Sequence, residues 1–156
     1  KTLSLMGGAG AIPMNSELLA LAENSDPKAV DLMMDFAHGP SGHFGGHPVP
    51  GLYHLNTGAM LVQSKEIKDT LGVDFRACQN YTNGFDAAKK LSLPTLSILA
   101  DQDRMCRLKD GQKLANHIKN SEVHIIKNCG HMMLLEEADQ TLAILKRFIK
   151  NNYPAI

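Results

Sequence analysis

Apolar runs and helical patterns alternate along the second half of this sequence. The run 95–100 is largely apolar and has turn signals on both sides, which is typical of a strand buried in a parallel sheet. A helical pattern follows over 108–118, then a second strand over 123–127 and an amphipathic helix over 136–151. The residues expected to face the core from that last helix are Ala138, Leu142, Leu145 and Ile149, with Phe148 beside them.

The first half of the chain has a different pattern, in which one short strand precedes helices. Residues 2–6 predict the strand, and a glycine-rich turn over 7–11 ends it. This turn lacks the third glycine of a dinucleotide-binding motif, so we interpret it as a tight turn that leaves a sheet. Asp26-Pro27 pairs a capping residue with a proline at the first helical position, which is typical of a helix start. Helices are expected over 17–23 behind an Asn15-Ser16 cap, from Asp26 to Gly39, from Asn56 or Thr57 to Gly72, and over 74–81.

The order of these elements predicts the fold class. A strand, a helical insert, and then strand, helix, strand and helix are the elements of an α/β protein with a parallel sheet. We therefore divide the chain into a core strand and turn over 1–13, a helical insert over 14–90 and an α/β core over 91–156.

Composition excludes several classes of protein. The 156 residues, 44% hydrophobic and 21% charged, suit one globular domain or a large piece of one. Sixteen basic and sixteen acidic side chains cancel, which argues against nucleic acid as a partner. No apolar run is long enough for a membrane span, and the start has no signal-peptide pattern. Three cysteines with no CxxC spacing indicate free thiols, so a cytoplasmic location is expected.

Four histidines gather in one glycine- and proline-rich segment, 38–54. Imidazoles in such a segment could bind zinc, copper or nickel, which keeps a metal-binding module open as an alternative function. The segment has no acidic residue and no cysteine, so we interpret it as a surface loop and expect neither a metal nor another cofactor. The histidines are His38, His43, His47 and His54.

Candidate chemistry follows the two strands of the second half. Asp101 and Asp103 come directly after the first of them, and His131 follows the second. Functional groups gather at the carboxyl ends of parallel strands, so a carboxylate and an imidazole are expected to meet there. Such a pair is the acid and base of a nucleophile–base–acid triad, in which the carboxylate orients the ring and the ring takes the nucleophile's proton.

At these residues the sequence resembles the C-terminal part of an α/β-hydrolase. The stretch 93–105 is similar to that family's acid strand and loop, and 128–136 is similar to its histidine loop, "GH....E". The resemblance implies Asp103, which directly precedes Arg104, as the triad acid, and His131 as the general base. It also implies that residues 2–13 form the strand after the nucleophile's helix and that 14–90 are a cap that shapes the substrate pocket.

Three neighbouring residues are expected to have no catalytic role. Asp101 competes with Asp103 but is interpreted as a turn residue. Glu136 is interpreted as a carboxylate favoured by the dipole at a helix N-terminus. Cys129 is interpreted as a small buried residue of the turn before His131.

The nucleophile of the family's triad is missing from this sequence. It belongs in a G-x-S-x-G elbow between a strand and a helix, and the nearest match surrounds Ser41, which has His43 in the last position and follows a helix. The nucleophile and the oxyanion donors are therefore expected upstream, in roughly a hundred residues that a domain of this class would still need. The chain alone is expected to be inactive, and to self-associate or to pair with that missing half.

Two main functions remain open on the sequence alone. The first is a serine hydrolase acting on a small-molecule ester or related acyl bond through a Ser-Asp-His triad, with Asp103 and His131 in this chain. The alternative is a non-catalytic binding protein of the same fold. The residue at the centre of the upstream elbow discriminates between them.

Overall fold

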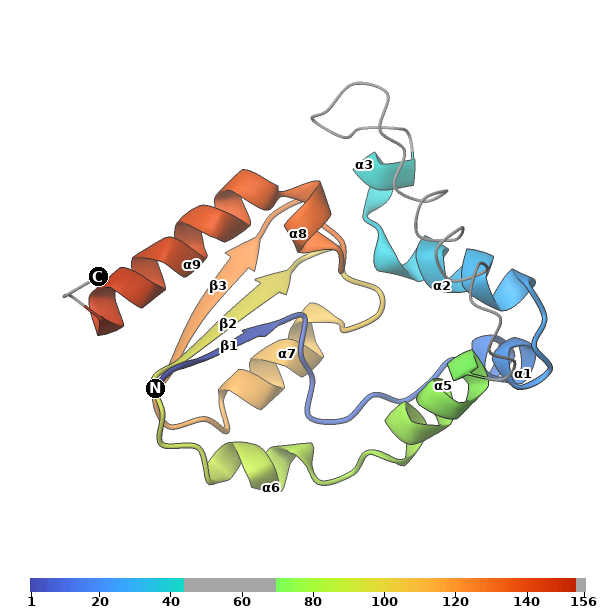
Figure 1. Ribbon diagram of the computed structural model, residues 1–156, viewed down its shortest axis with the longest axis horizontal. Helices are drawn as coiled ribbons and strands as arrows, with labels where there is room; N and C mark the ends of the chain where they lie inside the picture. The colour runs from blue at the N-terminus through green and yellow to red at the C-terminus, as the bar shows by residue number, and fades with distance from the viewer. Residues whose placement is uncertain (44–69, 154–156) are drawn as a thin grey trace.

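Three parallel strands form one sheet in the order β1-β2-β3 (Figure 1). The computed structural model describes residues 1–43 and 70–153. The strands are β1 (Leu3–Met6), β2 (Thr95–Ala100) and β3 (Ser121–Ile126). All six residues of the central strand β2 are buried, as its apolar pattern predicted. The predicted α/β class with a parallel sheet is confirmed, and β3 begins two residues earlier than expected.

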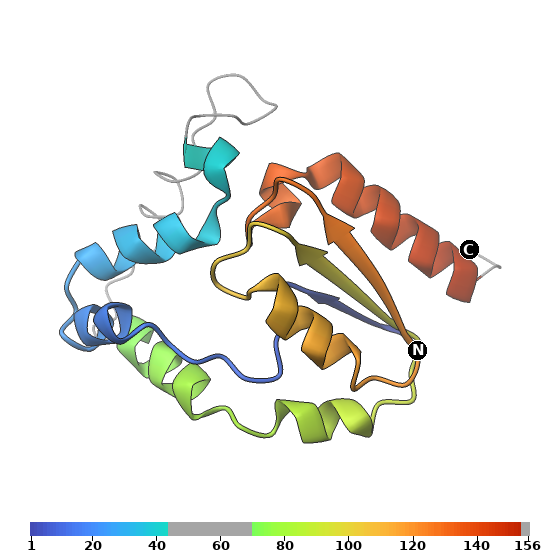
Figure 2. The same cartoon turned by 180° about the vertical axis from the view of Figure 1, so that it is seen from behind.

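Helices cover both faces of this sheet, because alternate residues of each strand point to opposite sides. Leu96 and Ile98 pack with Phe148 of helix α9 (Ala138–Asn152), whereas Leu99 lies against Gly111 of helix α7 (Leu108–Ala115). The two helices lie on opposite sides of the strands in both views (Figures 1 and 2). A further helix that the sequence analysis did not predict, α6 (Gly84–Lys89), packs against α7 through Ala88, Leu114 and Ile118.

The C-terminal helix differs from its prediction in two ways. It is preceded by a separate short helix, α8 (Met133–Glu136), and the helical conformation is interrupted at Glu137, where φ is −135°. The predicted inward face is right for Leu145 and Phe148 but wrong for Leu142 and Ile149, which are 47% and 37% exposed. The Thr141 hydroxyl donates to the backbone oxygen of Met133 and so turns a different face of α9 inward. That face consists of Thr141, Ile144, Leu145 and Phe148.

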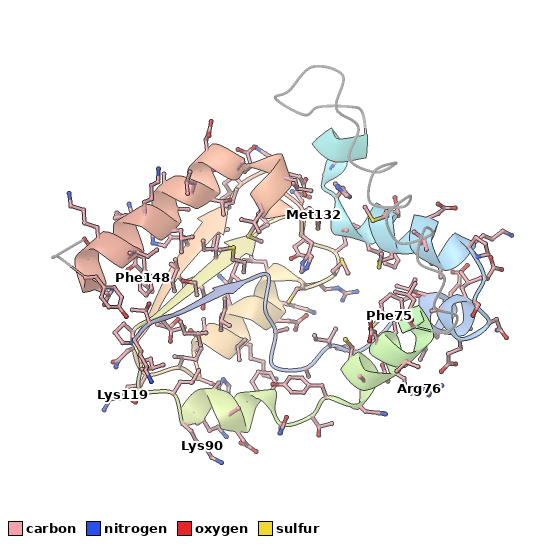
Figure 3. All side chains as sticks on the ribbon, in the orientation of Figure 1. Phe75, Arg76, Lys90, Lys119, Met132 and Phe148 are labelled. Atoms are coloured by element: carbon pink, nitrogen blue, oxygen red, sulfur yellow. The ribbon has the colours of Figure 1, made fainter. Side chains whose placement is uncertain are left out.

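Alanine substitutions at neighbouring positions of α9 test which face is buried. Phe148 is 2% exposed and points from α9 toward the sheet (Figure 3), so Phe148→Ala is expected to lower the free energy of unfolding by about 3–5 kcal/mol. Ile149→Ala is the matched control and is expected to cost about 1 kcal/mol, because much of its side chain is already in solvent. Urea unfolding of each variant measures the difference. Equal losses would contradict this orientation of α9.

The remaining described helices lie together beside the carboxyl ends of the strands (Figures 1 and 2). The predicted cap at Asn15 is confirmed, since its side chain accepts from the Leu18 N–H at 2.9 Å. Asp26 accepts from the Lys28 N–H at 2.9 Å, although the helix itself begins at Lys28, with Pro27 and not Asp26 as its cap residue. Their core includes Leu18, Ala22, Ala29 and Phe75, which is labelled in Figure 3. This helical group consists of α1 (Ser16–Glu23), α2 (Lys28–Ala37), α3 (Pro40–His43) and α5 (Thr70–Asn80).

The predicted helix end at Gly72 is wrong, because α5 continues through it. A Cβ atom at this glycine would lie 3.0 Å from the Ala22 oxygen and 3.0 Å from the Glu23 Cα. The glycine therefore marks the place where α5 approaches α1 closely, not a helix stop. The helix expected from Asn56 or Thr57 up to residue 69 lies outside the described residues.

Candidate active site

The two predicted site residues meet at the carboxyl end of the sheet. Asp103 lies in the loop after β2, and His131 lies in the loop after β3. The Nδ1 atom of His131 is 2.9 Å from Oδ2 of Asp103. The Asp103 side chain is fully buried, whereas the His131 side chain is 28% exposed. One end of the pair is thus fixed in the protein interior and the other reaches solvent.

Backbone donors fix the orientation of the Asp103 carboxylate. Its Oδ1 accepts the N–H groups of Met105, at 2.9 Å, and of Cys106, at 2.7 Å. These bonds use one carboxylate oxygen and leave Oδ2 for the imidazole. A carboxylate held in this way has little freedom to turn away from His131, since any rotation breaks short hydrogen bonds to an ionised acceptor.

The contact with Asp103 determines which nitrogen of His131 is basic. A carboxylate accepts hydrogen bonds, so the nitrogen that faces it, Nδ1, carries the proton in the neutral ring. The other nitrogen, Nε2, then has a free lone pair and can accept a proton from a hydroxyl group. The pair is therefore arranged to act as a general base, with the negative charge of Asp103 beside the imidazolium that forms.

The residue after strand β1, Gly7, also lies against this pair. This glycine directly follows β1 and has a φ of 58°, a conformation that other residues seldom adopt. A Cβ atom on Gly7 would lie 2.7 Å from Cε1 and 2.8 Å from Nδ1 of His131. The sequence pattern indicates only that Gly7 belongs to a turn and does not reveal its contact with the site. Its position at a strand end was the available signal.

Asp103, and not Asp101, is the carboxylate that is hydrogen-bonded to His131. Asp101 stands in the turn after β2, where its Oδ2 lies 3.6 Å from the Nζ of Lys127. This placement agrees with the interpretation of Asp101 as a turn residue. It also provides a nearby carboxylate for comparison with Asp103.

Two buried thiols flank the site but are not nucleophiles. Burial, aided by the charges of Asp103 and Asp110, raises the pKa of Cys106 to about 12. Burial and then the charge of Glu136 raise the pKa of Cys129 to about 12. Both side chains are protonated thiols at neutral pH, and only the thiolate is reactive. In the unfolded chain the pKa of a cysteine is about 8.5, so the unfolded chain loses these thiol protons at a lower pH than the folded chain. The free energy of unfolding is therefore expected to fall as the pH rises from about 8.5 toward 12.

The interpretation of Glu136 as a carboxylate at a helix N-terminus is wrong. Glu136 is the last residue of α8, a helix of only four residues, and α9 begins after it. Its side chain accepts hydrogen bonds from backbone N–H groups of Gly39 and Gly130. The carboxylate therefore binds the backbone of the histidine loop and of the segment that follows α2.

Other predicted features are only partly described. The backbone of Ser41 lies in α3, which follows α2 and not a strand, so this segment is not built like a nucleophile elbow. His47 and His54 lie outside the described residues, and so does the side chain of His43. Among residues 1–43 and 70–153 no three histidine, cysteine or acidic side chains are grouped as a metal site. The same part of the chain holds no helix that could span a membrane.

No family model matches this chain, whereas individual known proteins are similar to it. The monoacylglycerol lipase ABHD6 of Bos taurus is 33% identical over 60 residues, which are 38% of this chain and 18% of the lipase. The solved structure of a thermophilic esterase is 26% identical, with a TM-score of 0.76 over 96% of this chain and 56% of the esterase. An enol-lactonase from Burkholderia xenovorans has a TM-score of 0.80 at 16% identity, with the same coverage of both chains.

These similarities define the class of protein. The fold is that of the α/β-hydrolases, and the chain is similar to proteins of that class. It resembles the C-terminal part of the fold, as its acid and histidine loops predicted. The chain spans 56% of the length of the two solved structures, and its match to the curated lipase covers 18% of that protein.

Proposed function

We propose that this chain supplies the acid and the general base of a hydrolase that acts on a small-molecule ester or related acyl bond. The observation that carries the proposal is the buried Asp103 carboxylate at 2.9 Å from Nδ1 of the partly exposed His131. The names of the similar proteins support the substrate class, since they are an esterase, an enol-lactonase and a monoacylglycerol lipase. All three names refer to esters of carboxylic acids.

In this mechanism His131 moves one proton twice. Its Nε2 takes the proton from the nucleophile's hydroxyl as the oxygen attacks the acyl carbon, and the same nitrogen then gives that proton to the leaving alcohol. Asp103 stays ionised and stabilises the imidazolium between the two transfers. Water then repeats the sequence on the acyl-enzyme, with His131 again as the base.

The nucleophile in this proposal is a serine that lies upstream of the chain. The sequence has no G-x-S-x-G elbow, and a base without a hydroxyl to activate has no substrate chemistry to perform. The chain alone is therefore proposed to be inactive. The missing upstream half would pair with β1, which is paired only with β2 among the described residues and whose four residues are all half-buried. The helical group is proposed to be the cap over the substrate.

A fluorophosphonate probe, which labels activated serines, tests the location of the nucleophile. Intact masses are recorded for this chain, for the complete protein that contains it and for any co-purifying fragment. We expect this chain to gain no adduct and the species with the upstream sequence to gain one. The adduct should be lost when His131 is replaced by glutamine, because no base then activates the serine.

Each other result rejects a specific part of the proposal. An adduct on this chain itself, at Ser41 or elsewhere, would show that the nucleophile is not upstream. Failure of the complete protein to label would reject a serine hydrolase and favour the non-catalytic binding protein or a different nucleophile.

A further inference from the structure

One partly buried carboxylate connects the helical group to the loop that carries His131. The Oε2 atom of Glu136 accepts the N–H of Gly39, at 2.8 Å, and the N–H of Gly130, at 3.1 Å. Gly39 follows α2 and Gly130 directly precedes His131. We call these three residues the Glu136 bridge. A single oxygen atom therefore holds two segments that are about ninety residues apart in the sequence.

The two glycines of the bridge are packed against each other through their backbones. A Cβ atom on Gly39 would lie 2.8 Å from the Gly130 nitrogen, and one on Gly130 would collide with the Gly39 nitrogen. Beside them, the Met132 N–H donates to the Ala37 oxygen at 3.1 Å, and Met132 is labelled in Figure 3 at this junction. The residues on both sides of His131 thus contact the C-terminal end of α2 and the two residues after it.

A second connection joins α2 to the loop that carries Asp103. The Arg104 guanidinium lies 3.1 Å from the Asp35 carboxylate and 4.8 Å from the centre of the Phe36 ring. Both partners of this ion pair are about half exposed, so solvent and salt weaken it. The hydrogen bonds of the Glu136 bridge are partly buried, join two buried glycines and have a charged acceptor, which makes them the stronger connection.

We infer that Glu136 is a positioning residue for His131: through Gly130 and Gly39 it fixes the histidine loop against the end of α2. The side chain touches neither His131 nor Asp103 by any hydrogen bond found in the described residues, so it acts only through the backbone. The Oε1 atom of Glu136 is buried without a hydrogen-bond donor among the described residues. Burying an unpaired carboxylate oxygen lowers the stability of the fold, which favours a role for Glu136 beyond stability alone.

The placement of His131 can be measured without any hydrolysis. The full chain is labelled with ¹⁵N-histidine, and the Nδ1–H proton of His131 is assigned by its loss in His131→Gln. In Glu136→Ala we expect this proton to shift and to exchange with water about tenfold faster, the change that corresponds to one lost hydrogen-bonded tether. Glu136→Gln keeps an acceptor oxygen and is expected to restore the wild-type signal. The matched control is Asp139→Ala, which removes an exposed carboxylate three residues further on.

These variants separate positioning from stability. A folded Glu136→Ala chain with an unchanged His131 signal would overturn the inference, because the bridge would then be only structural. If Glu136→Ala does not fold, Gly39→Ala opens the bridge from the other side and is read in its place, with the same two outcomes.

The consequence for catalysis rests on the proposed function and is tested separately. In the complete protein, Glu136→Ala is expected to lower kcat by about 10²-fold with a smaller change in KM, as expected for a misplaced catalytic group. If His131→Gln leaves activity unchanged, the proposed function fails, while the NMR result still decides the role of Glu136.

Discussion

Asp103→Asn in the complete protein is expected to lower kcat for acyl hydrolysis by about 10⁴-fold, the loss typical of this substitution in a triad. The asparagine fills the same volume and can still accept from the N–H groups of Met105 and Cys106. It can also present its NH₂ group to Nδ1 of His131, which stabilises the wrong tautomer and leaves Nε2 protonated. Loss of the negative charge further destabilises the imidazolium.

Asp101→Asn is the matched control for this prediction. Asp101 belongs to the same loop and is partly buried, whereas Asp103 is fully buried, and the Asp101 carboxylate lies near Lys127 and not His131. We expect kcat to change by less than about threefold, because no proton transfer depends on this group. Steady-state rates on a short-chain ester, together with urea unfolding, measure both variants. A large loss at Asp101 with little loss at Asp103 would reverse the assignment of the acid.

The meeting of Asp103 and His131 could be predicted from the sequence because it depends on topology alone. Two apolar runs identified neighbouring parallel strands, and the carboxyl ends of such strands lie at one edge of a sheet. No detail of side-chain packing was needed. The resemblance to the α/β-hydrolases then selected Asp103 over Asp101, and the hydrogen bond between Asp103 and His131 agrees with that choice.

The features that the sequence did not predict depend on packing between segments far apart in the chain. Gly72 has the appearance of a helix stop, but its missing side chain is needed where α5 crosses α1. The inward face of α9 depends on Thr141, whose hydroxyl donates to the backbone oxygen of Met133 in α8. Glu136 likewise accepts a hydrogen bond from Gly39, a distant residue that no local sequence pattern connects to it.

The contact of Gly7 with His131 also depends on residues far apart in the chain, and the next residue, Gly8, allows a controlled experiment. Gly7→Ala is expected to lower kcat of the complete protein by about 10²-fold, because the new methyl group would occupy the space of the His131 ring and displace it. Because residue 7 has a positive φ, an alanine there also strains the folded state of the variant by about 1 kcal/mol. The displaced ring would also lose its alignment with Oδ2 of Asp103.

Gly8→Ala provides the control within the same turn. A Cβ atom there would lie 3.7 Å from the Cβ of Leu5 and 3.8 Å from Leu114, which are ordinary van der Waals distances. We therefore expect kcat within about twofold of the wild type, since neither the site nor the packing is disturbed. Parallel measurements of kcat and urea unfolding separate a displaced His131 from general destabilisation. Equal rate losses in the two variants would mean that the turn acts through stability, and that Gly7 has no specific role beside the imidazole.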